Sequence, residues 1–165
     1  MNLDKEIARG WGLLEAEVPT LQRDGGLVPK FLVENDREIA IILAPDPNVV
    51  NNPEGKDGLA ALVRDTVREL KAHTLYSISD AWLAQIDEAK AKPHLVEFVT
   101  RIGTKKATEM GLIVRRETLM CSIRTRSGQG TMLVWYYDRD GDVINMAGRE
   151  QMDGKDDGRF GDLFT

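Results

Sequence analysis

The segment from Glu117 to Ala147 constrains the fold of this 165-residue chain more than any other part of it. Apolar and polar residues alternate there in three short runs, which are separated by Ser127–Gly130 and by Asp140-Gly141. Alternation with a period of two is typical of half-buried strands, and an Asp-Gly pair is a strong signal for a two-residue hairpin. The pattern therefore predicts a meander of three antiparallel strands.

Two amphipathic helices precede this meander. The spacing of five apolar residues predicts a helix over residues 3–17 that ends near Pro19, and five more predict a second helix over Gly55–Ala72. After Pro93, apolar residues at helical spacing allow a further helix, which Gly103 and Gly111 weaken. The residues that define the first two faces are Leu3, Ile7, Trp11, Leu14 and Val18, and then Leu59, Leu62, Val63, Val67 and Leu70.

Three more strands are expected between the helices. Residues 28–34 and 38–44 are rich in strand-forming residues and are joined by a short polar turn, which favours an antiparallel hairpin. The second of these strands is apolar at successive positions, a pattern that indicates either burial on both faces or a central place in the sheet. Residues 74–83 form a further expected strand.

This order predicts a single α+β domain over residues 1–147. Its one mixed or antiparallel sheet has about six strands, and the helices pack mainly on one face. Val143–Met146 is expected to be the edge of the sheet. Residues 148–165 read as a polar, acidic tail that docks through Phe160, Leu163 and Phe164.

Composition excludes several classes of site and location. One cysteine and two histidines are too few for a Cys/His zinc site of four protein ligands, and neither a metal nor a cofactor is expected. The longest apolar run has six residues, Ile39–Ala44, whereas a membrane-spanning helix needs about 20. The first residues have no secretory-signal pattern, so the expected location is the cytoplasm, without membrane contact.

No catalytic motif is evident in the sequence. No serine lies in a Gly-x-Ser-x-Gly turn, and Cys121 lies within an expected strand, where a cysteine is usually inert packing. Asp80 is the one acidic residue in an otherwise apolar and small stretch. It either ends a strand at the surface or acts as a desolvated acid in a pocket.

The charge distribution is the least uniform feature of the chain. The formal net charge is −5, yet residues 101–126 carry seven basic and two acidic residues, while both flanking parts are acidic. Lysine and arginine at this density suit phosphate groups or an acidic protein surface, although most such runs are solvated faces. Tyr136 is expected to be the exposed aromatic beside them. The expected binding residues are Arg101, Lys105, Lys106, Arg115, Arg116, Arg124, Arg126 and Tyr136.

Over residues 28–140 the chain resembles a loose group of small prokaryotic and phage proteins. The resemblance rests on VPKFLVEND and IAIILAP in the first hairpin, on YSISDAW after the second helix, and on the step Arg115-Arg116-Glu117. It implies neither an activity nor any functional residue.

The leading hypothesis is therefore a non-catalytic binding or accessory protein of prokaryotic or phage type. It acts through protein–protein contacts, above all self-association, made by the basic 101–126 segment, the C-terminal strands and the tail. The first alternative is a nucleic-acid-associated factor that uses the same basic segment. The second is a small enzyme with an acidic residue, such as Asp80, in a pocket.

Overall fold

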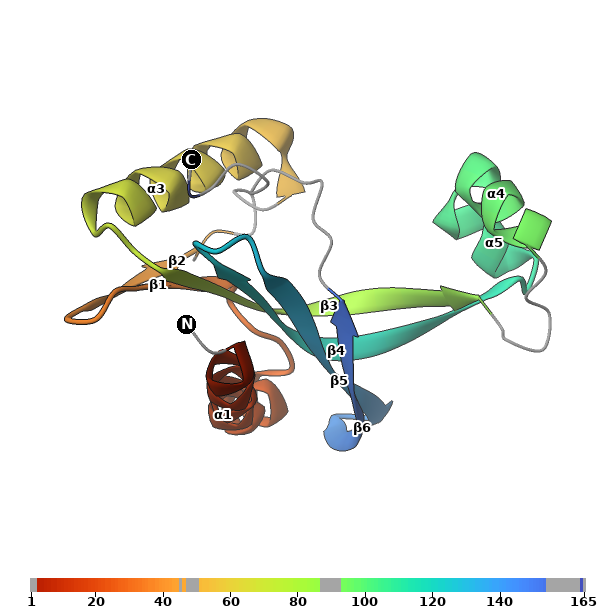
Figure 1. Ribbon diagram of the computed structural model, residues 1–165. Coiled ribbons are helices and arrows are strands. Elements are labelled where there is room, and N and C mark those ends of the chain that lie inside the picture. The colour runs from red at the N-terminus through yellow and green to blue at the C-terminus, as the bar shows by residue number, and fades with distance from the viewer. Residues whose placement is uncertain (1–2, 45, 47–50, 87–92, 154–163, 165) are drawn as a thin grey trace.

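The structure, a computed structural model, describes residues 3–44, 46, 51–86, 93–153 and 164. It confirms the α+β class, because six strands form one antiparallel sheet in the order β2-β1-β3-β4-β5-β6 with helices packed against it (Figure 1). The strands are β1 Lys30–Glu34, β2 Ile39–Leu43, β3 Thr74–Ile86, β4 Ile113–Thr125, β5 Gly130–Asp140 and β6 Val143–Asp153. The helices are α1 Leu3–Asp24, α3 Pro53–Glu69, α4 Pro93–Ile102 and α5 Thr104–Glu109.

The helices, expected mainly on one face, divide between the two faces of the sheet. Leu14 and Leu21 of α1 pack with Tyr76, Leu119 and Leu133, which lie on one face of the central strands. The other face of β1 and β3 is covered by α3, whose apolar residues pack in a second cluster. That cluster consists of Phe31, Val33, Val63, Val67, Ala72 and Leu75.

Helix α1 passes through Pro19, so the predicted end near this residue is wrong. A proline inside a helix removes one backbone hydrogen bond and costs about 3 kcal/mol. The helix nevertheless continues to Asp24. The reason is that Leu21, beyond the proline, is completely buried in the core that α1 shares with the sheet.

Helix α3 begins two residues before its predicted start. The Asn52 side chain caps it by accepting a hydrogen bond from the backbone N–H of Gly55 at 2.6 Å, and Pro53 takes the first helical turn. Proline suits that place because its missing N–H would have no partner within the helix.

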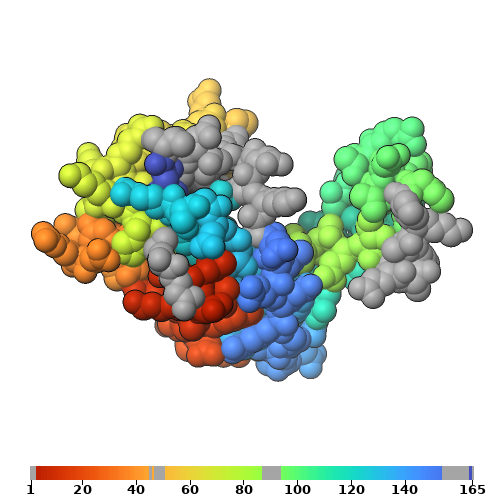
Figure 2. Space-filling model, viewed as in Figure 1, coloured from red at the N-terminus to blue at the C-terminus, as the bar shows by residue number. Residues whose placement is uncertain are grey.

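Strands β3 and β4 are much longer than predicted, and their paired ends project beyond the rest of the sheet. Their ladder runs from Thr74↔Thr125 to Ile86↔Ile113. The helices α4 and α5 lie at the far end of this hairpin, away from α1 and α3 (Figure 1), and Figure 2 shows open space between them and the main body. Gly103, with φ of +83°, separates the two helices, where the sequence predicts one weakened helix.

The position of β2 differs most from expectation. It is not central but lies at one edge of the sheet, while β6 forms the other edge, as predicted for that strand. Strand β6 also continues to Asp153, so the first residues of the expected tail belong to the sheet. Phe164 packs against the cluster that α3 covers, whereas Phe160 and Leu163 lie outside the described residues.

Candidate interaction surface

The basic residues of segment 101–126 do not form one surface. Arg101, Lys105 and Lys106 lie on α4 and α5 at the projecting end of the β3–β4 hairpin, and Arg115 and Arg116 begin β4 nearby. Arg124 and Arg126 lie at the opposite end of the same strand. A strand rises about 3.3 Å per residue, so the eight residues from Arg116 to Arg124 place the two groups about 26 Å apart along β4.

Several of these arginines stack on aromatic rings of their own chain. The guanidinium carbon of Arg101 lies 5.7 Å from the centre of the Phe98 ring. The same carbon of Arg115 lies 5.2 Å from the Trp82 ring centre. Such cation–π contacts contribute about 0.5–1 kcal/mol at exposed sites. These contacts hold the two side chains against their own chain, on α4 and on the projecting end of the β3–β4 hairpin.

Tyr136 is buried, at 5% exposure, so the expectation that it is the exposed aromatic is wrong. Its hydroxyl accepts a hydrogen bond from Nε2 of Gln85 and donates one to Glu150, both at 2.6 Å. Arg116 lies 4.2 Å above its ring. Burial, and then the bond to Glu150, raise the pKa of Tyr136. These partners come from three other strands, β3, β4 and β6. The sequence around Tyr136 therefore does not predict them.

Arg124 and Arg126 differ from each other in their surroundings. The Arg124 side chain is half-buried, and this burial lowers its pKa. Arg126 is exposed at the rim of a cavity that also contains Lys5 and His73. The eight predicted binding residues are thus divided among the projecting helices, strand β4, the buried position of Tyr136 and this rim.

Asp80 forms a hydrogen bond within the chain and lines a shallow groove beside α1, whereas Cys121 lies in the core. One carboxylate oxygen of Asp80 accepts a hydrogen bond from the backbone N–H of Leu27 at 3.1 Å, which ties the segment after α1 to the sheet. Cys121 is completely buried, and burial raises the pKa of its thiol to about 12. A thiol with that pKa is protonated and inert near neutral pH.

The edge strand β2 exposes a row of large aliphatic side chains. Ile39, Ile41 and Leu43 are 47%, 62% and 53% exposed. They lie opposite Glu34, Leu32 and Lys30 of β1, and therefore on the same face as α1. No charged residue interrupts the strand from Ile39 to Ala44. We call these three residues the β2 edge.

The backbone of the same three residues also faces outward. At the two ends of the β1–β2 pair, Asn35 donates to the carbonyl of Glu38 at 3.1 Å and Ala44 donates to the carbonyl of Pro29 at 3.0 Å. In an antiparallel ladder the bonded residues alternate, so the bonds between these ends run through the remaining even-numbered residues of β2. The N–H and C=O groups of Ile39, Ile41 and Leu43 then point away from β1. No described strand lies on that side.

Helix α1 stops short of β2. Two ion pairs mark its border with β1: Arg9 to Glu34 at 2.5 Å and Lys30 to Glu17 at 2.6 Å. A shallow groove of about 460 Å³ begins at this border and reaches Leu43. Val28, which is 45% exposed, also lines it. The β2 edge is therefore continuous with a partly apolar depression between α1 and the hairpin.

A second group of exposed apolar residues surrounds the projecting helices: Trp82, Val96, Met110 and Val114. Trp82 and Val114 belong to strands whose backbones are paired with each other in the β3–β4 ladder. The β2 edge is thus distinguished by presenting side chains and unpaired backbone groups together.

Neither the described residues nor known proteins assign a function to these surfaces. Within the described ranges, no helix is long and apolar enough to cross a membrane, and no group of three or more metal-ligating side chains is present. No family model, no curated protein and no solved structure matches the chain. Any functional assignment therefore depends on the geometry of this chain alone.

Proposed function

We propose that the chain is a non-catalytic binding protein that acts through protein–protein contacts and self-associates at the β2 edge. One observation carries this proposal. Ile39, Ile41 and Leu43 combine half-exposed aliphatic side chains with outward-facing backbone groups at an uncharged sheet edge. Exposed apolar edges of this kind are ready templates for pairing with another strand, and natural proteins usually protect them with charges, prolines or bulges.

A second copy of the same chain suits this edge well. In a two-fold antiparallel pair centred on Ile41, Ile41 lies opposite its own counterpart and Ile39 of one copy lies opposite Leu43 of the other. Every apolar side chain of the row then meets another apolar side chain, and the outward N–H and C=O groups find partners. Closed two-fold dimers are also the commonest assemblies of soluble chains.

The size of the surface predicts a dimer of moderate strength. Burying the exposed half of an aliphatic side chain contributes about 1 kcal/mol, and the row has only three such residues in each copy. Stable interfaces usually bury about 1,200–2,000 Å², which is more than three side chains supply. We therefore expect a dissociation constant of about micromolar size, with monomer present at low concentration.

Self-association at the β2 edge differs in location from the expected interface, which consisted of the basic 101–126 segment, the C-terminal strands and the tail. The basic segment supports it less, because its residues are distributed between two ends of β4 and several stack on the chain's own aromatic rings. The same separation divides the basic segment that the nucleic-acid alternative would use, with five of its seven basic residues at the projecting end and two at the other end of β4.

Sedimentation velocity over a range from about 1 to about 100 micromolar tests the proposal. The wild-type chain should shift from monomer to dimer across this range. Ile41→Lys should remain monomeric, because a lysine in the middle of the row places two like charges opposite each other at the two-fold axis.

Val143→Lys is the matched control, since Val143 is 59% exposed on the opposite edge strand, β6. It should dimerise like the wild type. A wild-type chain that stays monomeric throughout, or a loss of dimer in the Val143 variant alone, would refute the assignment to β2.

A further inference from the structure

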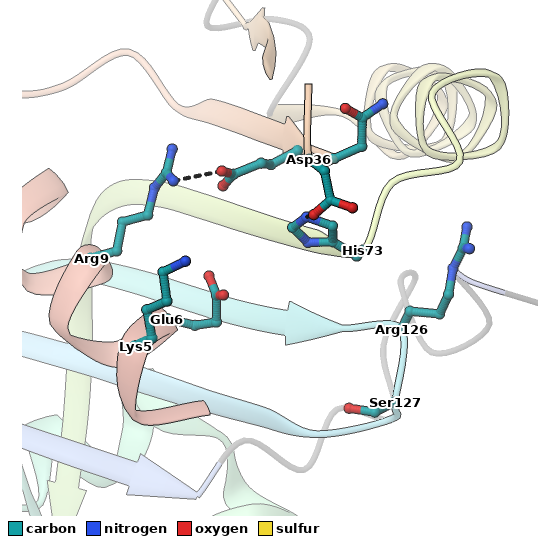
Figure 3. A pocket seen from close by; sticks show the side chains of 9 residues that line it. Lys5, Glu6, Arg9, Asp36, His73, Arg126 and Ser127 are labelled. Atoms are coloured by element: carbon teal, nitrogen blue, oxygen red, sulfur yellow. Dashed lines mark hydrogen bonds and ion pairs between the residues drawn. The ribbon is translucent and has the colours of Figure 1, made fainter. Parts of the chain in front are cut away.

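An open cavity of about 740 Å³ lies near the start of α1, beside the turn that joins β1 to β2 (Figure 3). Lys5, Glu6 and Arg9 reach into it from α1, and Arg126 and Ser127 stand at its opposite margin. Its lining is completed by residues of the β1–β2 turn and the beginning of β3: Glu34, Asn35, Asp36 and His73. None of the three residues of the β2 edge lines this cavity.

The deep part of the cavity contains two carboxylates. Glu6 is 6% exposed, and its Oε2 accepts a hydrogen bond from the hydroxyl of Tyr76, which is completely buried. The Glu34 side chain is 13% exposed, and its Oε1 lies 2.5 Å from Nη1 of Arg9. The second oxygen of Glu34 is buried and has no hydrogen-bond partner among the residues that the structure describes.

The two carboxylates in the deep part of the cavity lack both a second cation and a full set of hydrogen-bond donors. In the described part of the chain, Arg9 is the one cation that forms an ion pair with either carboxylate, and the formal charges of these three side chains sum to −1. An ionised carboxylate accepts about four hydrogen bonds, and a buried acceptor without a partner is unfavourable. A cationic N–H donor would satisfy both deficits.

The rim of the cavity has the opposite character. Lys5 and Arg126 are exposed, and neither forms an ion pair in the described part of the chain. Asp36 is already engaged with Nε2 of His73 at 3.3 Å. Two unpaired cations at a rim suit a carboxylate, and arginine can bind it through two parallel hydrogen bonds.

We propose that this cavity binds a small zwitterion, with its ammonium group at Glu34 and its carboxylate at Arg126 on the opposite margin. The class includes free amino acids and linear amino acids in which the two groups lie several bonds apart. The mixed charge of the lining disfavours ligands that carry only one of the two groups.

Isothermal titration of the full chain with 4-aminobutanoate, 6-aminohexanoate and L-lysine tests this binding. Hexylamine and hexanoate serve as probes that lack one charged group. At least one of the three zwitterions should bind, and each single-charge probe should bind about tenfold or more weakly than it. Absence of binding by all three zwitterions, or equal binding of hexylamine, overturns the proposal and leaves a solvent-filled polar cavity.

Matched variants locate the binding site. Glu34→Gln should weaken the zwitterion by about 10- to 100-fold, whereas Glu38→Gln, which removes the same charge from the adjacent turn outside the cavity, should leave it unchanged. Arg126→Gln should weaken it by about tenfold, against Arg37→Gln as control. Circular dichroism of each variant verifies folding. Equal effects of a variant and its control place the binding elsewhere and contradict the assignment.

Discussion

Ile41 lies directly opposite Leu32 in the β1–β2 ladder, yet Ile41 is 62% exposed while Leu32 is 8% exposed. Both side chains point to the face that α1 covers. Their exposure differs because α1 covers this face only as far as β1 and leaves β2 uncovered. The sheet thus carries its apolar face one strand further than its own helix covers. The proposed dimer places a second copy against that uncovered strand.

Salt concentration should separate this interface from one based on the basic segment. Each copy carries a formal net charge of −5, and the β2 edge itself is uncharged. Added salt screens the repulsion between copies without weakening apolar contacts. The dimer dissociation constant should therefore stay constant or fall between about 50 and about 500 mM NaCl. A marked rise, measured by sedimentation equilibrium, would instead indicate attraction between charged surfaces.

The projecting helices should be dispensable for the fold. Ile86 and Ile113 form the last pair of the β3–β4 ladder, so replacing residues 87–112 by Asn-Gly closes the hairpin with a favoured two-residue turn. Circular dichroism should show a cooperative thermal transition, because α1, α3 and both core clusters are retained. The shortened chain should also dimerise like the wild type. A monomeric but folded product would assign the interface to α4 and α5.

Two glycines of α1 should respond to alanine in opposite directions. A Cβ at Gly10 would lie 2.7 Å from Cδ1 of Ile123 and 2.8 Å from Cδ1 of Leu133, both of which are completely buried. Gly10→Ala should lower the free energy of unfolding by about 1 kcal/mol, because overpacking outweighs the better helix propensity of alanine. Among the described residues, no atom lies within 4 Å of a Cβ placed at Gly12. Gly12→Ala should therefore raise the free energy of unfolding by about 0.5–1 kcal/mol. Urea denaturation measures both, and stabilisation at both sites would contradict the packing of α1 on β4 and β5.

Tyr76 should make stability depend on pH in the alkaline range. Burial, and then the hydrogen bond to Glu6, raise the pKa of Tyr76 above its ordinary value of 10.0. Because the folded pKa lies above the unfolded one, the stabilisation is complete below about pH 10 and decreases as pH rises further. Cys121, whose pKa is raised to about 12, acts in the same direction.

Tyr76→Phe isolates the tyrosine contribution. It should destabilise the fold by about 1–3 kcal/mol at neutral pH, since Glu6 loses its donor. It should also flatten the decline in stability above about pH 10, relative to the wild type. Parallel pH profiles of the two proteins, from thermal denaturation, would exclude a buried neutral phenol at this position.

Local patterns in the sequence predict the order of elements well. The Asp140-Gly141 hairpin, the antiparallel pairing of β1 with β2 and the amphipathic face of α3 all follow from short-range rules that the structure obeys. Pro19 is the local exception, because the burial of Leu21 outweighs the cost of a proline in the helix.

Placement of strands within the sheet is less accessible from sequence. Strand β2 reads as a central strand because Ala40 and Ile42 pack under α3 while Ile39 and Ile41 are exposed, and hydrophobicity alone does not distinguish these two faces. The cavity near Glu6 is equally hidden, since its lining comes from four separate segments. Long-range packing, which a single sequence does not report, decides both.

Disulfide cross-linking of Ile41→Cys tests the proposed dimer most directly. In the two-fold register the two Cα atoms at position 41 are about 5.5 Å apart, which suits a disulfide. The native Cys121 is buried and should not react. If the dimer forms at the β2 edge, the Ile41→Cys chain should rapidly form a covalent dimer under mild oxidation. The Val143→Cys chain, with its cysteine on the opposite edge, should form little covalent dimer. Failure of Ile41→Cys to cross-link, or equally fast cross-linking at Val143, would contradict a dimer at the β2 edge.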